Sequence, residues 1–210
     1  MDTAFRRLRS IVFTALIFIV APAQAEQDSL LIMGDSLSAA YGVQTEQSWV
    51  AKLRERLTEQ GYDNWSVVNA SISGETTDGG LRRLPDLLEK HSPQIVMIEL
   101  GGNDGLRGFP PKVIRSNISE MIEQSQQAGS DVLVVGMQIP PNYGQRYTQA
   151  FASIFPELAE RYDTELVPFF LANVYDQEGL MQDDDIHPSA EAQVQLLNNV
   201  WPVLEPLLAD

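Results

Sequence analysis

The chain has 210 residues and a formal net charge of −15, and it contains no cysteine. The missing thiols exclude disulfide bonds, cysteine nucleophiles and thiolate metal sites. The strong negative charge argues against a nucleic-acid partner and against electrostatic binding to anionic lipid. We therefore expect no nucleic acid among its partners.

The first 25 residues have the composition of a secretory signal peptide. Arg6, Arg7 and Arg9 precede an apolar run over residues 11–21, which is followed by Pro-Ala-Gln-Ala. A basic start, a short apolar run and a small-x-small end are typical of a signal that is cleaved during export. The run is short for a membrane span, which needs about 20 apolar residues. A retained N-terminal anchor is the alternative.

Residues 26–210 have the length of one domain with a single core. We predict that cleavage after Ala25 releases this domain into the periplasm, without an integral membrane span; secretion from the cell is the alternative. The paired arginines hint at twin-arginine export, but the run after them is strongly apolar and favours the Sec route.

Short apolar runs alternate with amphipathic segments along this domain. The run Ile95-Val96-Met97-Ile98 has no polar alternation, which is typical of a strand covered on both faces in a parallel sheet. Alternating strands and helices indicate a three-layer α/β/α sandwich with right-handed crossovers. The expected strands cover residues 29–33, 66–70, 94–100, 131–137 and 165–168. The expected helices cover residues 46–60, 77–91, 111–128, 146–162 and 189–207.

Polar clusters lie beyond four of these strands. They occupy residues 34–38, 71–75, 101–104 and 183–188, and the last cluster lies between the fifth strand and the last helix. Parallel strands all end at one edge of the sheet, so we expect the clusters to converge on one crevice. Open α/β folds bind their ligands in such a crevice.

Ser36 comes just after the first expected strand and is the candidate nucleophile for acyl transfer. A serine hydroxyl is a weak nucleophile and needs an adjacent base. The chain has only two histidines. His91 is expected at the opposite edge of the sheet, before Pro93, whereas His187 is expected at the same edge as Ser36. Pro188 after it suits the first turn of the last helix, and His187 is the candidate base.

A catalytic imidazole needs an acceptor for its second N–H. Asp184, three residues earlier, can reach His187 across a tight turn, but Asp183 and Asp185 compete and spacing does not choose decisively among them. The same acidic run could instead hold a divalent cation. No second histidine or carboxylate cluster follows another expected strand, so we predict no metal ion and no cofactor.

Three groups are candidates for the donors that stabilise the oxyanion of the reaction. They are the backbone N–H of Ser36, the backbone N–H of Gly74 and the side-chain amide of Asn103. Gly74 has no side chain to block an approaching substrate. Alternatively, Gly74 could adopt a positive φ in a turn, and Asn103 could cap the next segment. Their shared edge with Ser36 and His187 favours the catalytic interpretation.

At these residues the sequence resembles the SGNH, or GDSL, hydrolase family. The four blocks of that family correspond to residues 34–38, 69–75, 101–104 and 184–187. Residues 69–74, 99–108, 141–144 and 181–184 are similar to segments of the multifunctional periplasmic esterases of Gram-negative bacteria. Those enzymes act as thioesterase, lysophospholipase, arylesterase and weak protease. The resemblance covers nearly all of residues 26–210.

The resemblance implies a carboxylic ester hydrolase with a flavodoxin-like sheet of five parallel strands. It implies Ser36 as nucleophile, His187 as general base and Asp184 as the residue that orients His187. It also implies Gly74 and Asn103 as oxyanion donors beside the Ser36 N–H. Small single-domain hydrolases of this type are usually monomers, so we expect a monomer.

The expected partner is a small-molecule acyl ester, an acyl thioester or a lysophospholipid. In close relatives the loop matching residues 105–110 moves when acyl chains bind, so we expect the acyl chain to lie over this loop and the segment after the fourth strand. The expected contacts are Leu106, Phe109, Ile139, Pro141 and Tyr143. The alternatives are a carbohydrate O-acetylesterase of the same superfamily and a periplasmic binding module without turnover. A pure binder needs no paired nucleophile and base.

Overall fold

The computed structural model describes residues 28–209, which are built around one parallel β-sheet. The five strands lie in the order β2-β1-β3-β4-β5, and every neighbouring pair is parallel. This order confirms the predicted flavodoxin-like sheet. The predicted signal peptide, residues 1–25, lies outside the described residues. The strands are β1 (Asp28–Gly34), β2 (Trp65–Asn69), β3 (Ile95–Glu99), β4 (Asp131–Val135) and β5 (Glu165–Val167).

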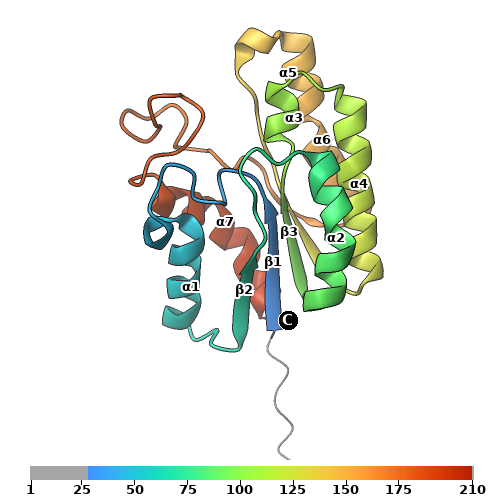
Figure 1. The fold of residues 1–210 in the computed structure, drawn as a ribbon, viewed down its shortest axis with the longest axis vertical. Coiled ribbons are helices and arrows are strands. Elements are labelled where there is room, and N and C mark those ends of the chain that lie inside the picture. The colour runs from blue at the N-terminus through green and yellow to red at the C-terminus, as the bar shows by residue number, and fades with distance from the viewer. Residues whose placement is uncertain (1–27, 210) are drawn as a thin grey trace, which may run out of the picture.

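Helices cover both faces of the sheet and complete the predicted three-layer sandwich (Figure 1). On one face, α1 (Trp49–Glu59) packs against α7 (Gln193–Leu208). On the other face, α4 (Pro111–Gln127) lies between α2 (Thr77–His91) and α6 (Ile154–Tyr162) and contacts both. Because the strands are parallel, the loops that follow them meet at one edge of the sheet, which we call the carboxyl edge.

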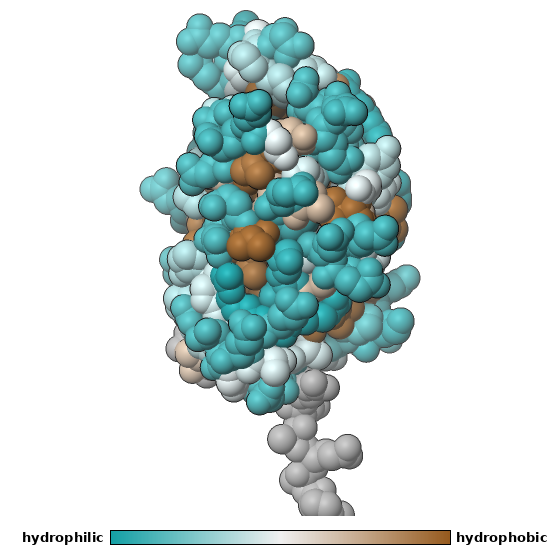
Figure 2. Space-filling model, turned by 90° about the vertical axis from the view of Figure 1, so that its left-hand side faces the viewer, coloured by the Kyte–Doolittle hydropathy of each residue, from teal (hydrophilic) through white to brown (hydrophobic). Residues whose placement is uncertain are grey.

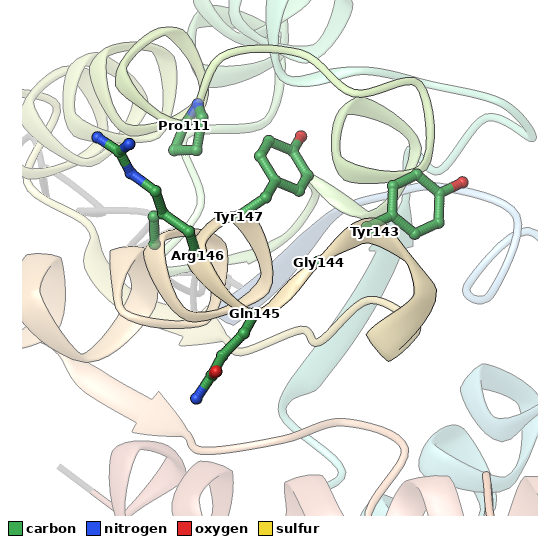
Figure 3. A pocket seen from close by; sticks show the side chains of 7 residues that line it. Pro111, Tyr143, Gly144, Gln145, Arg146 and Tyr147 are labelled. Carbon is green, nitrogen blue, oxygen red and sulfur yellow. The ribbon is translucent and has the colours of Figure 1, made fainter.

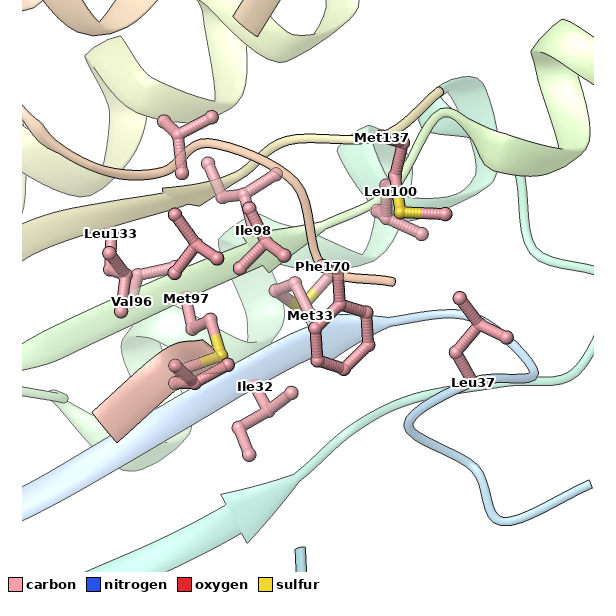
Figure 4. Close-up of a cluster of buried hydrophobic side chains, with 14 of the residues drawn as sticks. Ile32, Met33, Leu37, Val96, Met97, Ile98, Leu100, Leu133, Met137 and Phe170 are labelled. Atoms are coloured by element: carbon pink, nitrogen blue, oxygen red, sulfur yellow. The ribbon is translucent and has the colours of Figure 1, made fainter. Parts of the chain in front are cut away.

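The two central strands, β1 and β3, are buried on both faces. Residues 30–33 and 95–98 are each at most 1% exposed. Phe170 packs against them from the segment after β5 (Figure 4), and its ring meets that of Trp49 edge to face at 5.5 Å. Each apolar side chain buried in this way contributes about 1.5–3 kcal/mol relative to an exposed one. The strand that precedes Ser36 is therefore firmly held.

The predicted helix over residues 146–162 is wrong, because two helices occupy this stretch. α5 (Gln145–Ala152) ends before Ser153, and α6 begins at Ile154. Pro156 lies in the first turn of α6 and has no N–H to donate to the carbonyl of Ala152. The helix therefore breaks between Ala152 and Ile154.

The last predicted helix, over residues 189–207, starts too early. Pro188 forms an antiparallel bridge with Met181, and the Ser189 N–H donates to the Leu180 carbonyl at 2.8 Å. These pairings hold the backbone in a hairpin, so α7 begins only at Gln193. Pro188 therefore does not occupy the first turn of the last helix.

Three smaller differences concern short segments at the carboxyl edge. The helix predicted from residue 46 starts at Trp49, since the Ser48 side chain accepts the Ala51 N–H and caps it. A short helix, α3 (Gly102–Leu106), follows β3 and was not predicted. Single turns of 3-10 helix also lie at η1 (Thr45–Gln47) and η2 (Pro141–Tyr143).

The face of the molecule that Figure 2 shows is mostly hydrophilic. The face in Figure 2 carries separate hydrophobic spots between larger polar areas. Within residues 28–209, no helix has both the length and the apolar character that a membrane crossing requires.

Candidate active site

The serine turn, residues 34–38, follows β1 directly and begins with Gly34, where neighbouring side chains leave little room for a Cβ atom. A Cβ atom on Gly34 would lie 2.7 Å from Glu99 Oε2 and 2.7 Å from Ser71 Oγ, closer than real Cβ atoms come to such neighbours. Ser36 itself is 7% exposed. Close contacts with the neighbouring strand ends therefore fix the position of Ser36.

Ser36, His187 and Asp184 form one hydrogen-bonded chain. Ser36 Oγ lies 3.0 Å from His187 Nε2, and His187 Nδ1 lies 2.6 Å from Asp184 Oδ2. If Nδ1 carries the proton that it shares with the carboxylate, Nε2 is an acceptor for the serine hydroxyl. The structure thus brings together the three residues that the sequence singled out, and their arrangement can move a proton from Ser36 to His187.

Hydrogen bonds distinguish Asp184 from the neighbouring aspartates. Its Oδ1 accepts the backbone N–H groups of Ile186 and His187, each at 3.0 Å. Burial alone would raise the pKa of Asp184, but the hydrogen bonds from the backbone and ring of His187 and from Ile186 outweigh it and lower the pKa to about 2. All three aspartates are exposed, so these hydrogen bonds, and not burial, set Asp184 apart. Asp184 is therefore an ionised acceptor at neutral pH.

The histidine hairpin, residues 180–189, carries both His187 and Asp184. The Gln182 N–H donates to the His187 carbonyl at 2.7 Å and closes the hairpin. The Gln182 side-chain Nε2 lies 2.9 Å from the Pro188 carbonyl and 2.9 Å from the Tyr41 carbonyl. This single amide therefore links the hairpin to the segment that follows the serine turn.

The ring of Tyr41 lies against the imidazole of His187. The ring centroids are 4.3 Å apart and the planes are tilted by 36°. The backbone N–H of Tyr41 donates to the Ser36 carbonyl at 3.2 Å, and 52% of the residue is exposed. The face of an aromatic ring attracts a nearby cation. Tyr41 is thus placed to stabilise His187 when it carries a positive charge.

Asn103, in α3, is held beside the serine turn by Asp35. Asn103 Nδ2 donates to Asp35 Oδ2 at 3.0 Å, and Asp35 Oδ1 accepts the Leu37 N–H at 3.0 Å. Asp35 is 3% exposed, and its burial raises its pKa to about 6, although these two hydrogen bonds and the charge of His187 act in the opposite direction. One N–H of the Asn103 amide therefore points at Asp35. This fixes the plane of the amide group and with it the direction of the second N–H.

The loop after β2 brings Gly74 to the same edge. The Ile72 N–H donates to the Gly34 carbonyl at 3.1 Å, so this loop is tied to the end of β1. Gly74 has a φ of +79°, a conformation that favours glycine. Its carbonyl accepts a hydrogen bond from Arg107 Nη2 at 3.1 Å. The loop after α3 therefore contacts the predicted oxyanion glycine directly.

A comparison with known families confirms the resemblance seen in the sequence. The GDSL-like Lipase/Acylhydrolase family matches residues 32–194. The chain belongs to this family. The match begins within β1 and ends at the start of α7, so it spans the serine turn, the loops after β2 and β3, and the histidine hairpin.

Several similar proteins are named as esterases. The chain is 51% identical to Esterase TesA of Pseudomonas aeruginosa, over 92% of this chain and 96% of that protein. It is 49% identical to an Arylesterase of Vibrio mimicus, over 89% of this chain and 92% of that protein. A solved structure of the psychrotrophic esterase EstA from Pseudoalteromonas sp., inhibited by monoethylphosphonate, matches with a TM-score of 0.82. That pair is 41% identical over 87% of this chain and 100% of the other.

The residues predicted to line the acyl chain in this GDSL-family protein divide into exposed and buried ones. Phe109 and Tyr143 are 37% and 38% exposed, and Pro141 is also exposed. Leu106 is half-buried, and its carbonyl accepts the Tyr143 hydroxyl at 2.8 Å. Ile139 is only 8% exposed, so it supports the site from beneath.

A depression of about 460 Å³ lies next to this region (Figure 3). The rings of Tyr143 and Tyr147 stack in it, with centroids 6.4 Å apart. The Tyr147 hydroxyl donates to the Phe109 carbonyl at 2.6 Å. Of the five residues predicted along the acyl chain, Tyr143 alone belongs to its lining, which consists of Pro111, Tyr143, Gly144, Gln145, Arg146, Tyr147 and Ala150.

The sequence offers two alternatives to this site, namely His91 as the base and a metal ion bound by the acidic run. His91 is the last residue of α2, and its carbonyl faces Ser29 at the start of β1, at the edge opposite to Ser36. Among residues 28–209, no group of three or more His, Cys, Asp or Glu side chains is arranged to hold a metal ion.

Sequence reasoning missed four residues that support the site. Tyr41, Gln182 and Arg107 act through contacts between distant loops, and no local pattern marks them. Glu99 does have a signal, because it is a charged residue inside the otherwise apolar strand β3. Such a residue is rarely buried without a specific role.

Proposed function

We propose that this ester hydrolase of the GDSL family uses Ser36 as its nucleophile, His187 as its general base and Asp184 to orient His187. The observation that carries the proposal is the 3.0 Å distance between Ser36 Oγ and His187 Nε2. A serine hydroxyl becomes an effective nucleophile when an adjacent base can accept its proton. The family match and the esterase names of the relatives support the same chemistry.

In the first step His187 Nε2 takes the Ser36 proton as Oγ attacks the carbonyl carbon of the ester. Asp184 holds the Nδ1 proton and stabilises the imidazolium that forms. The imidazolium then gives its proton to the departing alcohol or thiol, which leaves an acyl group on Ser36. Water, deprotonated by His187, attacks this acyl group, and the serine is released with the carboxylic acid.

Three donors are proposed to stabilise the oxyanion in both steps: the N–H of Ser36, the N–H of Gly74 and the Asn103 amide. The Asp35 carboxylate supports this role by holding one side of the Asn103 amide at 3.0 Å. Donors that are fixed before the reaction stabilise developing charge without reorganisation. Removing one such donor costs roughly a hundred- to a thousandfold in kcat.

We propose carboxylic esters, acyl thioesters and lysophospholipids as substrates. The curated relative from Escherichia coli, 44% identical over 88% of this chain and 86% of that protein, is named Thioesterase 1/protease 1/lysophospholipase L1. The exposed Phe109 and Tyr143 offer apolar surface to an acyl chain at the carboxyl edge. Exchanging Leu106 or Phe109 for alanine should change the acyl-chain-length preference if the chain lies there.

The proposal is tested by hydrolysis assays of the purified protein and of Ser36→Ala. The substrates are p-nitrophenyl acetate and butyrate, acetylated xylan, an acyl thioester and a lysophospholipid. We expect the wild type to cleave the esters and Ser36→Ala to be inactive. Hydrolysis that survives in Ser36→Ala would overturn the mechanism. A wild type that cleaves only acetylated xylan would favour a carbohydrate O-acetylesterase.

A phosphonate ester gives a second, covalent test. We expect it to inactivate the wild type and to add its mass to the peptide that contains Ser36. Ser116→Ala is the matched control, because Ser116 is exposed on α4, and this variant should be labelled like the wild type. Labelling of Ser36→Ala would place the nucleophile at another residue.

We also propose that the protein is exported and that residues 1–25 are its signal peptide. The basic start and apolar run of this segment support the proposal. Sequencing the N-terminus of protein recovered from the periplasm should give Glu26 as the first residue. An intact N-terminus in a membrane fraction would indicate a retained anchor instead.

A further inference from the structure

We infer that Glu99 is a positioning residue that works as a neutral carboxylic acid and holds the serine turn from beneath. The inference deepens the proposed function and rests on the role of Ser36 in it. Glu99 is the last residue of β3 and is 1% exposed. It has no place in the proton transfers of the mechanism, so its burial needs a separate explanation.

One oxygen of Glu99 binds the residues on both sides of Ser36. Oε2 accepts the backbone N–H of Asp35 at 3.2 Å and the hydroxyl of Ser38 at 2.7 Å. Ser38 Oγ in turn accepts the Trp49 indole N–H at 3.3 Å. A carbonyl oxygen has two lone pairs and can accept both of these hydrogen bonds. Glu99 thereby fixes the backbone of the serine turn without touching the reacting atoms.

The other oxygen of Glu99 lacks the donors that a buried carboxylate would need. Oε1 is buried and has no hydrogen-bond partner within residues 28–209. A carboxylate spreads its charge over both oxygens, and a buried charge without donors on one side is strongly unfavourable. A carboxylic acid with its proton on Oε1 leaves Oε2 as a neutral acceptor. The hydrogen-bond pattern therefore fits the neutral acid better than the carboxylate.

The surroundings of Glu99 favour the same state. Asp35 is the charged group that raises the pKa of Glu99, whereas the charges of His187 and Asp104 shift the pKa of Asp35. Two adjacent carboxylates rarely both ionise. Asp35 has a donor on each oxygen, Leu37 N–H and the Asn103 amide, so Asp35 is the better anion. Burial and the charge of Asp35 raise the pKa of Glu99 well above its ordinary value.

Matched substitutions separate a neutral acid from a charged one. Glu99→Gln keeps the acceptor oxygen and the volume, so we expect kcat within about threefold of the wild type. Glu99→Leu removes the acceptor and leaves two buried donors unpaired, so we expect kcat to fall about tenfold or more, with KM little changed. If Glu99→Gln loses as much kcat as Glu99→Leu, the inference is wrong.

Infrared spectroscopy reports the protonation state without reference to activity. At about pH 8, where an acid such as Asp35 is mostly ionised, we expect a carboxylic acid C=O band from Glu99. The band should vanish in Glu99→Gln and persist in Glu165→Gln, since Glu165 is an exposed residue of β5. A wild-type spectrum without this band would overturn the inference even if Glu99→Leu does not fold.

The proposed function and the neutral state of Glu99 can be disproved independently of each other. If Ser36→Ala keeps its activity or is labelled by the phosphonate, the proposed function is wrong, whatever the infrared spectrum shows. If Ser36→Ala is inactive and the Glu99 band is absent, the proposed function stands and the neutral acid does not.

Discussion

The serine turn and the histidine hairpin contribute to one hydrogen-bonded chain, but they are held in opposite ways. The serine turn is buried, with Asp35 3% and Ser36 7% exposed, and strand β3 supports it through Glu99. The histidine hairpin lies in the long segment between β5 and α7, where Ile186 is 41% exposed. Its own backbone pairs and the Gln182 amide hold it in place.

This difference predicts that the two halves of the site have different stabilities. Opening of a segment costs little where few apolar contacts are buried and much where the segment belongs to the core. The hairpin should therefore open while the sheet is still folded. With His187 as the proposed general base, hydrolysis requires the less stable half, so conditions that loosen the hairpin should abolish hydrolysis before the fold is lost.

The largest expected effect lies on the buried side, in Asp35→Asn. An amide at this position cannot accept at both Leu37 and Asn103, so the Asn103 amide would turn away from the oxyanion. We expect kcat to fall by about a hundred- to a thousandfold, as for the loss of an oxyanion donor. Steady-state kinetics with p-nitrophenyl butyrate measure the change. An unchanged kcat would show that Asp35 does not orient Asn103.

The next largest effect is expected on the exposed side, in Gln182→Ala. The substitution removes the hydrogen bonds from the side chain to the carbonyls of Tyr41 and Pro188. We expect kcat to fall about tenfold because His187 is less well placed. Activity should also be lost at a lower urea concentration than the circular dichroism signal. Gln177→Ala, in an exposed loop, is the control. Coincident transitions would contradict the proposed difference in stability.

A smaller effect is expected from Tyr41→Ala. The ring lies against that of His187, and an exposed contact between a cation and a ring is worth about 0.5–1 kcal/mol. We expect kcat/KM to fall about two- to fivefold. Tyr41→Phe retains the ring and should behave as the wild type. Equal losses in both variants would assign the effect to the hydroxyl instead of the ring.

The smallest effect concerns the pH dependence of stability, which should have opposite signs in the two halves. The folded pKa of Asp35 is raised from 3.8 to about 6, so its contribution to stability falls as the pH rises through this window. The folded pKa of Asp184 is lowered from 3.8 to about 2, so its contribution is present above 3.8 and is lost as the pH falls towards 2. Urea unfolding of the wild type, Asp35→Asn and Asp184→Asn at a series of pH values measures both terms. If the contributions of Asp35 and Asp184 to the free energy of unfolding changed with pH in the same direction, the two pKa shifts would be wrongly assigned.

The elements that the sequence predicted well are those whose signals are local. The apolar run at residues 95–98 marks a buried strand by composition alone, and the polar clusters mark the carboxyl edge because parallel strands all end there. Pro156 could also have been recognised as a sign of a break between two helices, since its missing N–H is a property of the residue itself. The prediction of a single helix over residues 146–162 did not take this proline into account.

The features that the sequence could not provide depend on contacts between distant segments. The start of α7 is delayed because Ser189 pairs with Leu180 across the histidine hairpin. The choice of Asp184 over its neighbours depends on which carboxylate faces the ring of His187. Spacing along the chain leaves several carboxylates within reach. The family resemblance implies Asp184, and the folded hairpin gives the physical reason, since it brings this carboxylate to the ring of His187.

The hydrogen bond from Trp49 to Ser38 couples the fluorescence of this tryptophan to the serine turn. Trp49 is fully buried, and its indole N–H lies 3.3 Å from the hydroxyl beside the serine turn. The other two tryptophans lie elsewhere, since Trp65 donates to Leu208 near the end of α7 and Trp201 belongs to that helix. A chain with phenylalanine at positions 65 and 201 would emit from Trp49 alone. Its fluorescence would then follow rearrangements of the serine turn in real time, without an added dye.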